Sequence, residues 1–495
     1  MSSRLDPRTP VLIGAGQVLQ RDTAFESADE PAALMARAVA AACADATLDA
    51  VPDADSIRVV ELYTCRYADP GRSVARQVGL NPRESAITTA GGNSPQALVN
   101  ATAREISDGT LDLAILVGGE CWRTRSRARA EGFELGWGDR HAQLQVDRVI
   151  GDTRSLLHPT ESARGIGPAP LTYALLESAV RAHSGRTPSE HQAHLGALWA
   201  KFSDAAAANP HAWSRTARSA AEITTVSPSN RIISEPYTKA MNANNQVDMS
   251  AALVMCSVEA ATRLGVPIER WVFPLVAVDC HDTIELTARP SLGYSTGVER
   301  GAETVLELAG IGLDDIEHLD LYSCFPSSVQ IGRSALGVPD DRPLTVTGGL
   351  AFAGGPWNNY AMHAIATMMA RLRESPSDYG LVWANGGYVT KHAFGLYSGT
   401  PQRPFQTGSP QTAIDAHGHR PRPGPVASHG SGTLEAYTVT RSRDGEATRA
   451  HASCLLADGR RAWGNTTAPD TLSALTADDW IGTSALITAD GEIVL

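Results

Sequence analysis

The sequence lacks several features that mark common classes of protein. Its seven cysteines are scattered along 495 residues, and no two of them form a CxxC pair. This spacing excludes a disulfide scaffold and a four-cysteine zinc site. No apolar run approaches the roughly 18 residues that a membrane-spanning helix needs. Residues 1–8 also lack the apolar core of a signal peptide. We therefore expect a cytoplasmic protein in a reducing compartment.

An excess of basic charge is also absent. Lysine and arginine number 42 against 54 acidic residues, which gives a formal net charge of −12. Nucleic-acid binding needs a basic face that neutralises phosphates, so the sequence argues against a nucleic-acid partner. A local basic pocket for a phosphorylated ligand remains open. The His417-Gly-His419 motif has no further ligand nearby, and we expect no metal site.

Strand and helix patterns alternate in the first part of the chain. Residues 10–16 form a short apolar run that ends in glycine, and residues 30–46 are rich in alanine with helical spacing. Residues 57–64 and 111–117 are typical of strands, and residues 94–107 of a helix. This order predicts an α/β fold with a parallel sheet covered by helices.

The second half of the chain repeats this order. A helical segment at 297–309 precedes a strand at 317–323 and a helix at 326–336. Residues 55–65 and 314–324 both match D-x-I-x-x-x-x-L-Y-[ST]-C without a gap, in the same helix–strand context. This agreement indicates an internal duplication.

Two segments depart from the duplicated pattern. One is polar, mixed and rich in Arg, Ser, Ala and His, which indicates an insertion folded over the sheet. In the other, a Pro- and Gly-rich linker leads to alternating residues with Asp-Gly turns, which predict a small β barrel or sandwich. The predicted boundaries are 1–120 with 247–275 for the first half, 121–246 for the insertion, 276–400 for the second half, and 401–495 for the linker and the small β unit.

Several local motifs, taken in order, resemble the thiolase superfamily over roughly residues 8 to 400. They are Val11-Leu-Ile-Gly-Ala-Gly-Gln17, Ile233-Ser-Glu-Pro236 with Val247-Asp-Met-Ser-Ala-Ala-Leu-Val254, Leu321-Tyr-Ser-Cys-Phe325, Gly348-Gly-Leu-Ala-Phe-Ala-Gly-Gly-Pro356 and Asn385-Gly-Gly387. The whole chain most resembles the mycobacterial-type thiolase-like proteins type 1, which carry an additional C-terminal domain. The resemblance implies two βαβαβαββ halves in α/β/α/β/α layers, an inserted loop domain, and a CoA thioester as ligand.

The first catalytic motif departs from the family pattern. Thiolases carry a nucleophilic cysteine in a C-x-S-G pattern at the start of a helix, where the helix dipole favours the thiolate. The matching residue here is Gly91, and Asn93-Ser94 stands in place of S-G. Glycine cannot hold an acyl group, so we expect weak or absent thiolysis. Ser94 is the nearby hydroxyl, either as a helix cap or as a replacement nucleophile.

The second motif keeps groups that can carry a proton. The family reads N-E-A-F or H-D-C-F, and this chain reads Tyr322-Ser-Cys324-Phe325. The resemblance assigns Cys324 the acid/base role, and a phenol at Tyr322 can donate to an oxyanion. Alternatively both side chains are structural, as the duplicate pair Tyr63 and Cys65 allows. We expect only the second pair to line a pocket.

The last two motifs lose their reactive residues. The family's G-H-P is Gly354-Gly-Pro356, and His363 in the next helix is the nearest histidine. The C-x-G region reads Asn385-Gly-Gly387 without a cysteine, in a form that permits close approach of a ligand. The predicted catalytic residues are Tyr322, Cys324, Tyr388 and His392. The predicted CoA- or substrate-binding residues are Gly91, Asn93, Ser94, Gly348, Gly349, Gly354, Gly355, Asn385, Gly386 and Gly387.

Three functions are compatible with these motifs. The resemblance implies an acyltransferase of lipid metabolism, similar to acetyl-CoA acetyltransferase, although the missing nucleophile contradicts a covalent mechanism. Retro-aldol cleavage of a β-hydroxyacyl-CoA needs only an oxyanion site and an acid/base group. A non-catalytic acyl-CoA-binding or scaffold protein is the third. The arginines at 123, 125, 127 and 129 either meet CoA phosphates or form a solvated face. We expect CoA or acyl-CoA as the ligand, no other cofactor, and a monomer in preference to a homodimer.

Overall fold

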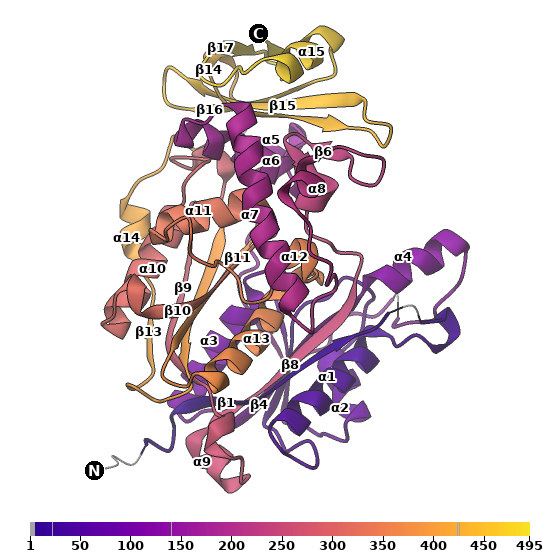
Figure 1. Ribbon diagram of the computed structural model, residues 1–495, viewed down its shortest axis with the longest axis vertical. Helices are drawn as coiled ribbons and strands as arrows, with labels where there is room; N and C mark the ends of the chain where they lie inside the picture. The colour runs from indigo at the N-terminus through magenta and orange to yellow at the C-terminus, as the bar shows by residue number, and fades with distance from the viewer. Residues whose placement is uncertain (1–4, 22, 140, 423, 425) are drawn as a thin grey trace.

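The structure is a computed structural model that describes residues 5–495 apart from residues 22, 140, 423 and 425. Two sheets with helices on their faces form the body, and a third sheet lies at one end of the molecule (Figure 1). Within the described residues, no helix combines the length and apolar character that crossing a membrane requires. Short 3-10 helices lie at Phe25–Ser27, Lys239–Met241, Ile268–Arg270, Leu286–Ala288, Leu313–Asp315 and Trp357–Asn359.

The first sheet is formed by the first half of the chain. Its strands are β1 (Pro10–Leu19), β2 (Ser56–Val59), β3 (Glu84–Thr88), β4 (Leu113–Cys121), β5 (Arg148–Ile150) and β8 (Asp248–Ser257), and its helices are α1 (Pro31–Asp45), α2 (Pro70–Gln77) and α3 (Ser94–Ser107). The strand order is β1-β8-β4-β2-β3-β5. Strands β4, β2, β3 and β5 run parallel, as predicted, whereas β8 is antiparallel to β1 and β4.

The second sheet repeats the first. It contains β9 (Phe273–His281), β10 (Ile316–Leu321), β11 (Tyr379–Gly386), β12 (Lys391–Ser398) and β13 (Gln406–Gly408), with α10 (Thr296–Ala309), α11 (Pro326–Leu336), α12 (Gly349–Phe352) and α13 (Tyr360–Glu374). Its order, β10-β11-β12-β9-β13, reproduces the order β2-β4-β8-β1 of the first sheet. The two copies of the D-x-I motif fall on β2 and β10, so the duplication is confirmed.

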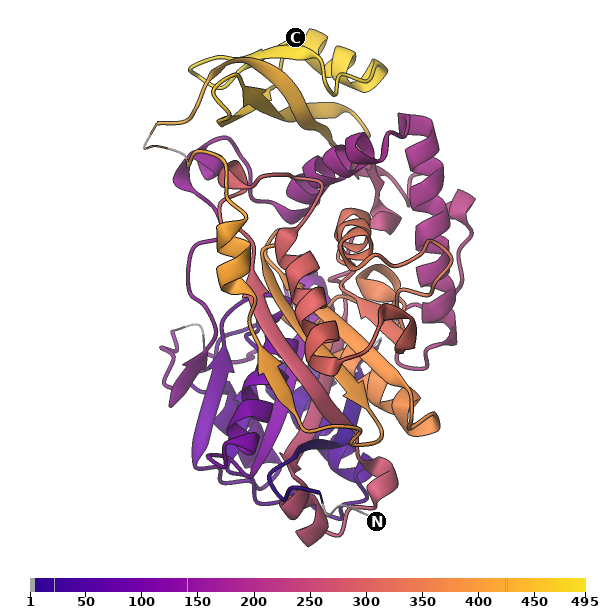
Figure 2. The same ribbon diagram turned by 90° about the vertical axis from the view of Figure 1, so that its left-hand side faces the viewer.

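The two sheets stack with helices between and outside them. Helices α3 and α13 contact both sheets, α1 and α2 cover the first sheet, and α10 and α11 cover the second (Figure 2). The buried amide of Asn100 on α3 donates to the carbonyl of Phe394 in β12 at 3.3 Å, which ties the central helix to the second sheet. The layers are therefore α/β/α/β/α, as the thiolase resemblance implies.

The insertion is largely helical. It holds α4 (Trp122–Glu131), α5 (Pro159–Ala163), α6 (Ala169–Ser184), α7 (Pro188–Ala208), α8 (Ala220–Thr224), β6 (Ile232–Ser234) and β7 (Tyr237–Thr238). One of its segments, β5, extends the first sheet by pairing in parallel with β3. The sheet therefore draws on a part of the chain that the predicted boundary assigns to the insertion, because β3 would otherwise leave its backbone groups unpaired at the edge.

The C-terminal unit contains the predicted antiparallel strands and one helix that the pattern did not predict. Its elements are β14 (Gly430–Arg441), β15 (Ala447–Leu456), β16 (Arg461–Thr466), α15 (Pro469–Ala477), β17 (Ser484–Ile487) and β18 (Ile493–Val494). The sheet order is β16-β15-β14-β17-β18, and β6 of the insertion pairs with β14. The segment predicted as a linker also contains structure, since β13 pairs with β9 and α14 (Gln411–Ala416) follows it.

A buried arginine fixes the C-terminal unit to the body. Arg461 is fully buried and forms an ion pair with Glu435 at 2.7 Å. The same guanidinium donates to the carbonyl oxygens of Thr287 and Arg289 at 3.2 and 2.9 Å, in the second half of the body. The unit is therefore docked rather than loosely tethered.

Candidate functional site

The candidate site lies where loops of both halves meet at the first turn of α3. Gly91 donates its amide to Asn358 Oδ1 at 3.0 Å, from the segment that precedes α13. Lys391, at the start of β12, donates to the carbonyl of Ala90 at 2.8 Å. The loop after β10 supplies Tyr322, which lies against Gly92. The turn at residues 90–93, where a thiolase carries its nucleophile, is therefore held from three sides.

The Tyr322 phenol fills the space beside this turn. A β-carbon added at Gly92 would collide with the Tyr322 hydroxyl and lie 2.6 Å from the carbonyl oxygen of Asn385. At Gly91, where φ is +154°, an added β-carbon would lie 2.5 Å from Asn93 Oδ1 and 3.1 Å from Lys391 Nζ. A side chain at either position would therefore have to displace its neighbours.

Tyr322 is a buried hydrogen-bond donor without a protein partner. Its side chain is 6% exposed, and the ring packs edge-on against Tyr360 at a centroid distance of 5.7 Å. Its hydroxyl forms no hydrogen bond with another described residue. Burial raises the pKa of Tyr322 well above its usual value, and the neighbouring Cys324 and Tyr63 raise it further. The phenol is therefore protonated at neutral pH and free to donate.

Cys324 lies deeper in the same loop, beside an aromatic residue of the insertion. Burial raises the pKa of its thiol to about 12. Tyr173 is the neighbour: its hydroxyl donates to the carbonyl of Gly387 at 2.7 Å and accepts from Asn385 Nδ2 at 2.9 Å. Its ring stacks on Phe325 at 4.6 Å. Sequence reasoning missed Tyr173, because no motif marks it within α6.

The other two predicted catalytic residues, Tyr388 and His392, form hydrogen bonds with groups other than Tyr322 and Cys324. The Tyr388 hydroxyl donates to the carbonyl of Gly167 at 2.6 Å. His392 is 1% exposed, and its Nε2 bonds Asp282 Oδ2 at 2.9 Å. Burial lowers the pKa of His392, so the ring is neutral and donates to the carboxylate. Asp282 also accepts from the amide of Gly297 at 3.1 Å, so this contact ties β12 to the start of α10.

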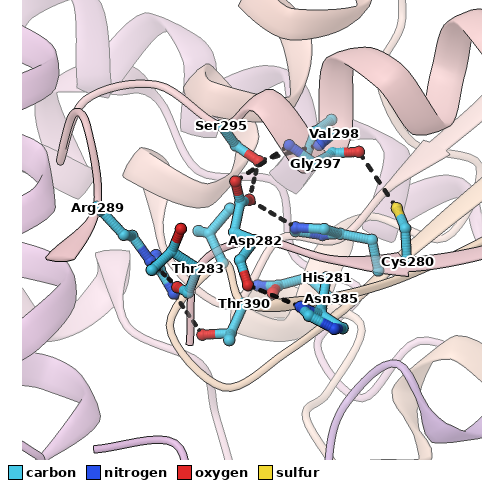
Figure 3. A network of polar contacts seen from close by, with 12 residues as sticks. Cys280, His281, Asp282, Thr283, Arg289, Ser295, Gly297, Val298, Asn385 and Thr390 are labelled. Atoms are coloured by element: carbon cyan, nitrogen blue, oxygen red, sulfur yellow. Dashed lines mark hydrogen bonds and ion pairs between the residues drawn. The ribbon is translucent and has the colours of Figure 1, made fainter. Parts of the chain in front are cut away.

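A buried arginine holds the loop between β11 and β12. Arg289 donates to the carbonyl of Tyr388 and to Thr390 Oγ1, both at 2.6 Å, and to the carbonyl of Thr283 at 3.0 Å (Figure 3). The loop that contains Gly386 and Gly387 is therefore fixed before any ligand binds.

The amides near the turn have unpaired acceptors. Asn385 is 1% exposed, and its Oδ1 has no partner among the described residues, and the same holds for Asn93 Oδ1. Ser94 is the first residue of α3, and its hydroxyl donates to the carbonyl of Thr89 at 2.7 Å instead of capping the helix. Asn93 Oδ1 is therefore an available acceptor beside Gly91, and Asn385 Oδ1 is one beside Tyr173.

The remaining predicted glycines lie against protein segments. A β-carbon at Gly348 would contact Ala206 in α7, and one at Gly349 would lie 2.7 Å from Phe202. One at Gly354 would contact Met249, and one at Gly355 would lie 3.4 Å from the carbonyl oxygen of Asn244. These glycines let the insertion and β8 pack closely onto the second half.

The first copy of the repeated pair, not the second, lines a large cavity. Tyr63 is 41% exposed, and it borders a cavity of about 830 Å³ together with Cys65, Arg125 and Arg129. Cys324 is only 8% exposed, like the buried Tyr322. The surroundings of the two copies therefore differ: Tyr173 of the insertion lies beside Cys324, whereas Tyr63 packs against Trp357 and borders the cavity. That only the second pair acts on a ligand stays a prediction.

No metal centre accompanies these groups. Within the part of the chain that the structure describes, no three or more His, Cys, Asp or Glu side chains are placed to hold a metal ion. The chemistry that the geometry offers is hydrogen bonding from neutral donors at the turn.

Comparisons with known proteins agree with this architecture. Residues 412–492 match the family model described as "Thiolase-like protein type 1 additional C-terminal domain". No curated protein sequence matches the chain. A solved structure, a monomeric SCP2-thiolase like protein type 1 from Mycobacterium smegmatis, is 32% identical, with 99% of this chain and 100% of that chain covered and a TM-score of 0.85.

More distant structures share the fold of the body. The Ltp2-ChsH2(DUF35) aldolase is 18% identical with a TM-score of 0.60, and the acetyl-CoA acetyltransferase from Syntrophomonas wolfei is 16% identical with a TM-score of 0.57. Each of these two alignments covers 80% of this chain and 100% of the other chain. The full-length match and the matched C-terminal domain together decide the assignment. The chain belongs to the thiolase superfamily, as a member of the SCP2-thiolase-like proteins type 1 with the additional C-terminal domain.

Proposed function

We propose that this protein binds a CoA thioester beside the turn at residues 90–93 and does not transfer an acyl group through a covalent intermediate. The observation that carries the proposal is the unpartnered Tyr322 hydroxyl against Gly92. Acyl transfer by a ping-pong route needs a side-chain nucleophile, and Gly91 has no side chain. Tyr322 also occupies space from which such a nucleophile would act.

The unpaired groups at the turn match the polar atoms of a pantetheine thioester. The Tyr322 hydroxyl is a donor for the thioester carbonyl oxygen, in the manner of an oxyanion-hole donor. Asn385 Oδ1 and Asn93 Oδ1 are acceptors for the amide N–H groups of the pantetheine chain. Buried polar atoms without partners are costly, so a ligand that pairs with them gains affinity and specificity.

Binding is favoured over retro-aldol cleavage by the protonation states. Retro-aldol cleavage removes the β-hydroxyl proton with a base, moves the Cα–Cβ electron pair into a thioester enolate and then protonates Cα. Burial raises the pKa values of Tyr322, Cys324 and Tyr388, so all three are protonated at neutral pH. They can stabilise the enolate oxygen and supply a proton, but they are poor bases. Cleavage remains the second candidate because Tyr322 and Cys324 lie side by side at the turn.

We also propose that the protein is a monomer. The support is the 32% identical SCP2-thiolase like protein type 1, which is monomeric. Strand β5 also pairs with β3, so β3 is not available for pairing with a second chain. Light scattering coupled to size exclusion should give the mass of one chain, 52.3 kDa.

One experiment separates the functions. The purified protein is mixed with acetoacetyl-CoA and with 3-hydroxyacyl-CoA thioesters, with and without added CoA, while calorimetry measures binding and chromatography measures products. We expect binding without acetyl-CoA formation from acetoacetyl-CoA. A free carbonyl product without added CoA would establish cleavage instead. CoA-dependent turnover on the order of 10 s⁻¹ would refute the proposal.

A matched pair of variants tests the role of Tyr322. Tyr322→Phe removes only the hydroxyl, and the loss of one buried hydrogen bond of about 1–1.5 kcal/mol weakens acyl-CoA binding roughly fivefold to tenfold. Tyr63→Phe makes the same change in the first copy of the repeat and should leave this affinity unchanged. An equal loss of acyl-CoA affinity in both variants would show that the ligand does not bind the Tyr322 hydroxyl specifically.

A further inference from the structure

A second cavity lies beside the same turn and is separate from Tyr322. Its volume is about 420 Å³, and it lies between α3, the end of β5 and the start of β12. Lys391 borders this cavity, where its ammonium contacts the turn at Ala90 and Gly91, whereas Tyr322 contacts Gly92. Tyr322 and Cys324 do not line it. A ligand here is therefore distinct from the thioester proposed above.

Lys391 is a buried cation without a carboxylate partner. Its side chain is 7% exposed, and its ammonium donates to the carbonyl of Ala90 at 2.8 Å. Among the described residues, no carboxylate oxygen lies within 4.0 Å of Nζ. An ammonium buried in this way is costly unless a counter-ion neutralises it.

The carboxylates that border the cavity are already paired with arginines. Asp279 accepts from Arg104 at 3.0 Å, and Asp152 accepts from Arg154 at 2.7 Å. Neither is within ion-pair distance of Lys391, so the ammonium forms no direct ion pair, although the nearby Asp152 raises its pKa. The missing partner is an anion from outside the chain.

The rest of the wall determines the kind of anion. Ala97 and Leu98 of α3 and Ile150 of β5 give the cavity an apolar side, and the hydroxyl groups of Thr89 and Ser94 lie close to the turn. The volume is in the range of small-ligand sites. A bare inorganic ion would leave the apolar wall unused, whereas a carboxylate with a short hydrocarbon tail uses both parts.

We propose that this cavity is a binding site for a small organic carboxylate, with the carboxylate paired with Lys391 and the hydrocarbon tail against Ala97, Leu98 and Ile150. Because Lys391 also donates to the carbonyl of Ala90, an acid paired with Lys391 lies next to this end of the turn. The proposal does not rest on the CoA-thioester function, since the carboxylate pairs with Lys391 and the thioester with Tyr322, although Asn93 borders both sites.

The chain supplies its own internal controls for a test. It contains three lysines, at positions 201, 239 and 391, and the first two are exposed. The native protein is acetylated with an amine-reactive ester, and the modification of each lysine is followed by mass spectrometry. Hexanoate at about ten times its dissociation constant should slow acetylation of Lys391 roughly tenfold, by mass action. Acetylation of Lys201 and Lys239 should be unchanged, and hexanol, which lacks the charge, should protect none of the three.

Two lysine variants test whether the carboxylate pairs with Lys391, and inorganic phosphate tests whether the site prefers an organic acid. Hexanoate should raise the melting temperature of the wild type and of Lys239→Met, but not of Lys391→Met. If Lys391→Met does not fold, the labelling of the wild type decides alone. Absence of protection at saturating hexanoate, or equal protection of Lys239, overturns the proposal. Protection by inorganic phosphate without protection by hexanoate overturns the assignment to an organic carboxylate.

Discussion

The hydroxyl of Tyr322 lies directly against the backbone of Gly92, so that a single β-carbon at Gly92 would collide with it. In a thiolase this turn presents a nucleophile, but here a phenol from the second half of the chain occupies the adjoining space. The contact joins the two copies of the duplicated fold at the point where their loops meet. It also explains why glycine at position 92 is a packing requirement.

Replacing Gly92 with alanine tests this contact. We expect Gly92→Ala to lower the free energy of unfolding by about 1–3 kcal/mol, as for other overpacked interior positions. In the Tyr322→Ala background the cost should be smaller, because the hydroxyl and ring carbon that the β-carbon meets are gone. Urea unfolding of the four proteins in the cycle gives the coupling energy.

Gly312→Ala is the matched control. An added β-carbon there meets its nearest atom at 3.6 Å, an ordinary contact. It should therefore change the unfolding free energy by no more than about 0.5 kcal/mol, as for most surface substitutions. Equal costs at Gly92 and Gly312 would contradict the collision with Tyr322.

Sequence patterns predicted the elements better than the site. The ranges 94–107 and 326–336 coincide with α3 and α11, because each helix has an apolar period and proline in its first turn. The repeat at 55–65 and 314–324 predicted the duplication. Local patterns of this kind predict where a helix begins and ends, and they reveal a repeated segment.

Those local patterns could not predict contacts between segments that are distant in the sequence. Tyr173 meets Cys324 only because α6 folds over the second half, and no motif signals it. The exposure of Tyr63 and the burial of Tyr322 depend on what covers each copy, which the shared motif cannot encode. The short β5 was hidden in a polar segment because its three residues are stabilised by pairing with β3 rather than by an apolar period.

Cys65 should be the cysteine that reacts first in the native protein. It is partly exposed at the cavity that Tyr63 borders, whereas the other six cysteines are buried. Burial raises its pKa to about 12, so the reaction is slow in absolute terms. At mildly alkaline pH we expect iodoacetamide to modify Cys65 at least about tenfold faster than Cys324, since access by the reagent limits buried thiols.

Peptide mass spectrometry measures this order, and Cys65→Ser is the control that should abolish the fast phase. Modification of Cys324 at a comparable rate would show that the segment containing Tyr322 opens to solvent. That result would contradict the closed packing of the second copy.

A buried carboxyl near the first copy should make stability depend on pH. Glu120 is 1% exposed and accepts from the amides of Tyr63 and Thr64 at 2.6 and 2.8 Å. Burial raises its pKa from 4.5 to about 7. The folded chain therefore binds more protons than the unfolded chain between these pH values, so this contribution to stability is complete below pH 4.5 and is lost as the pH rises through 7.

Glu120→Gln isolates this effect, because an amide does not titrate. Between pH 4.5 and 8 the unfolding free energy of the wild type should fall relative to that of the variant by up to about 3 kcal/mol. Chemical unfolding at a series of pH values gives the difference. Parallel curves for the two proteins would show that Glu120 does not titrate in this window.

The docking of the C-terminal unit gives the last prediction. Arg461 is fully buried between Glu435 of its own unit and the carbonyl oxygens of Thr287 and Arg289 in the body. Arg461→Met removes the charge but keeps much of the length, and it leaves the Glu435 carboxylate buried without its partner. Breaking a buried pair in this way should destabilise the protein by about 3–5 kcal/mol.

Proteolysis distinguishes docking from simple tethering. Elastase should cut the wild type after Val426, which is 74% exposed, and the two fragments should remain together during size exclusion, because the contacts of Arg461 do not depend on the linker. In Arg461→Met the same cut should release the C-terminal fragment. Arg460→Met is the control, since Arg460 is exposed and bonds only Asp458 at 2.7 Å. Release of the fragment from the wild type would show that the buried ion pair is too weak to hold the unit in place.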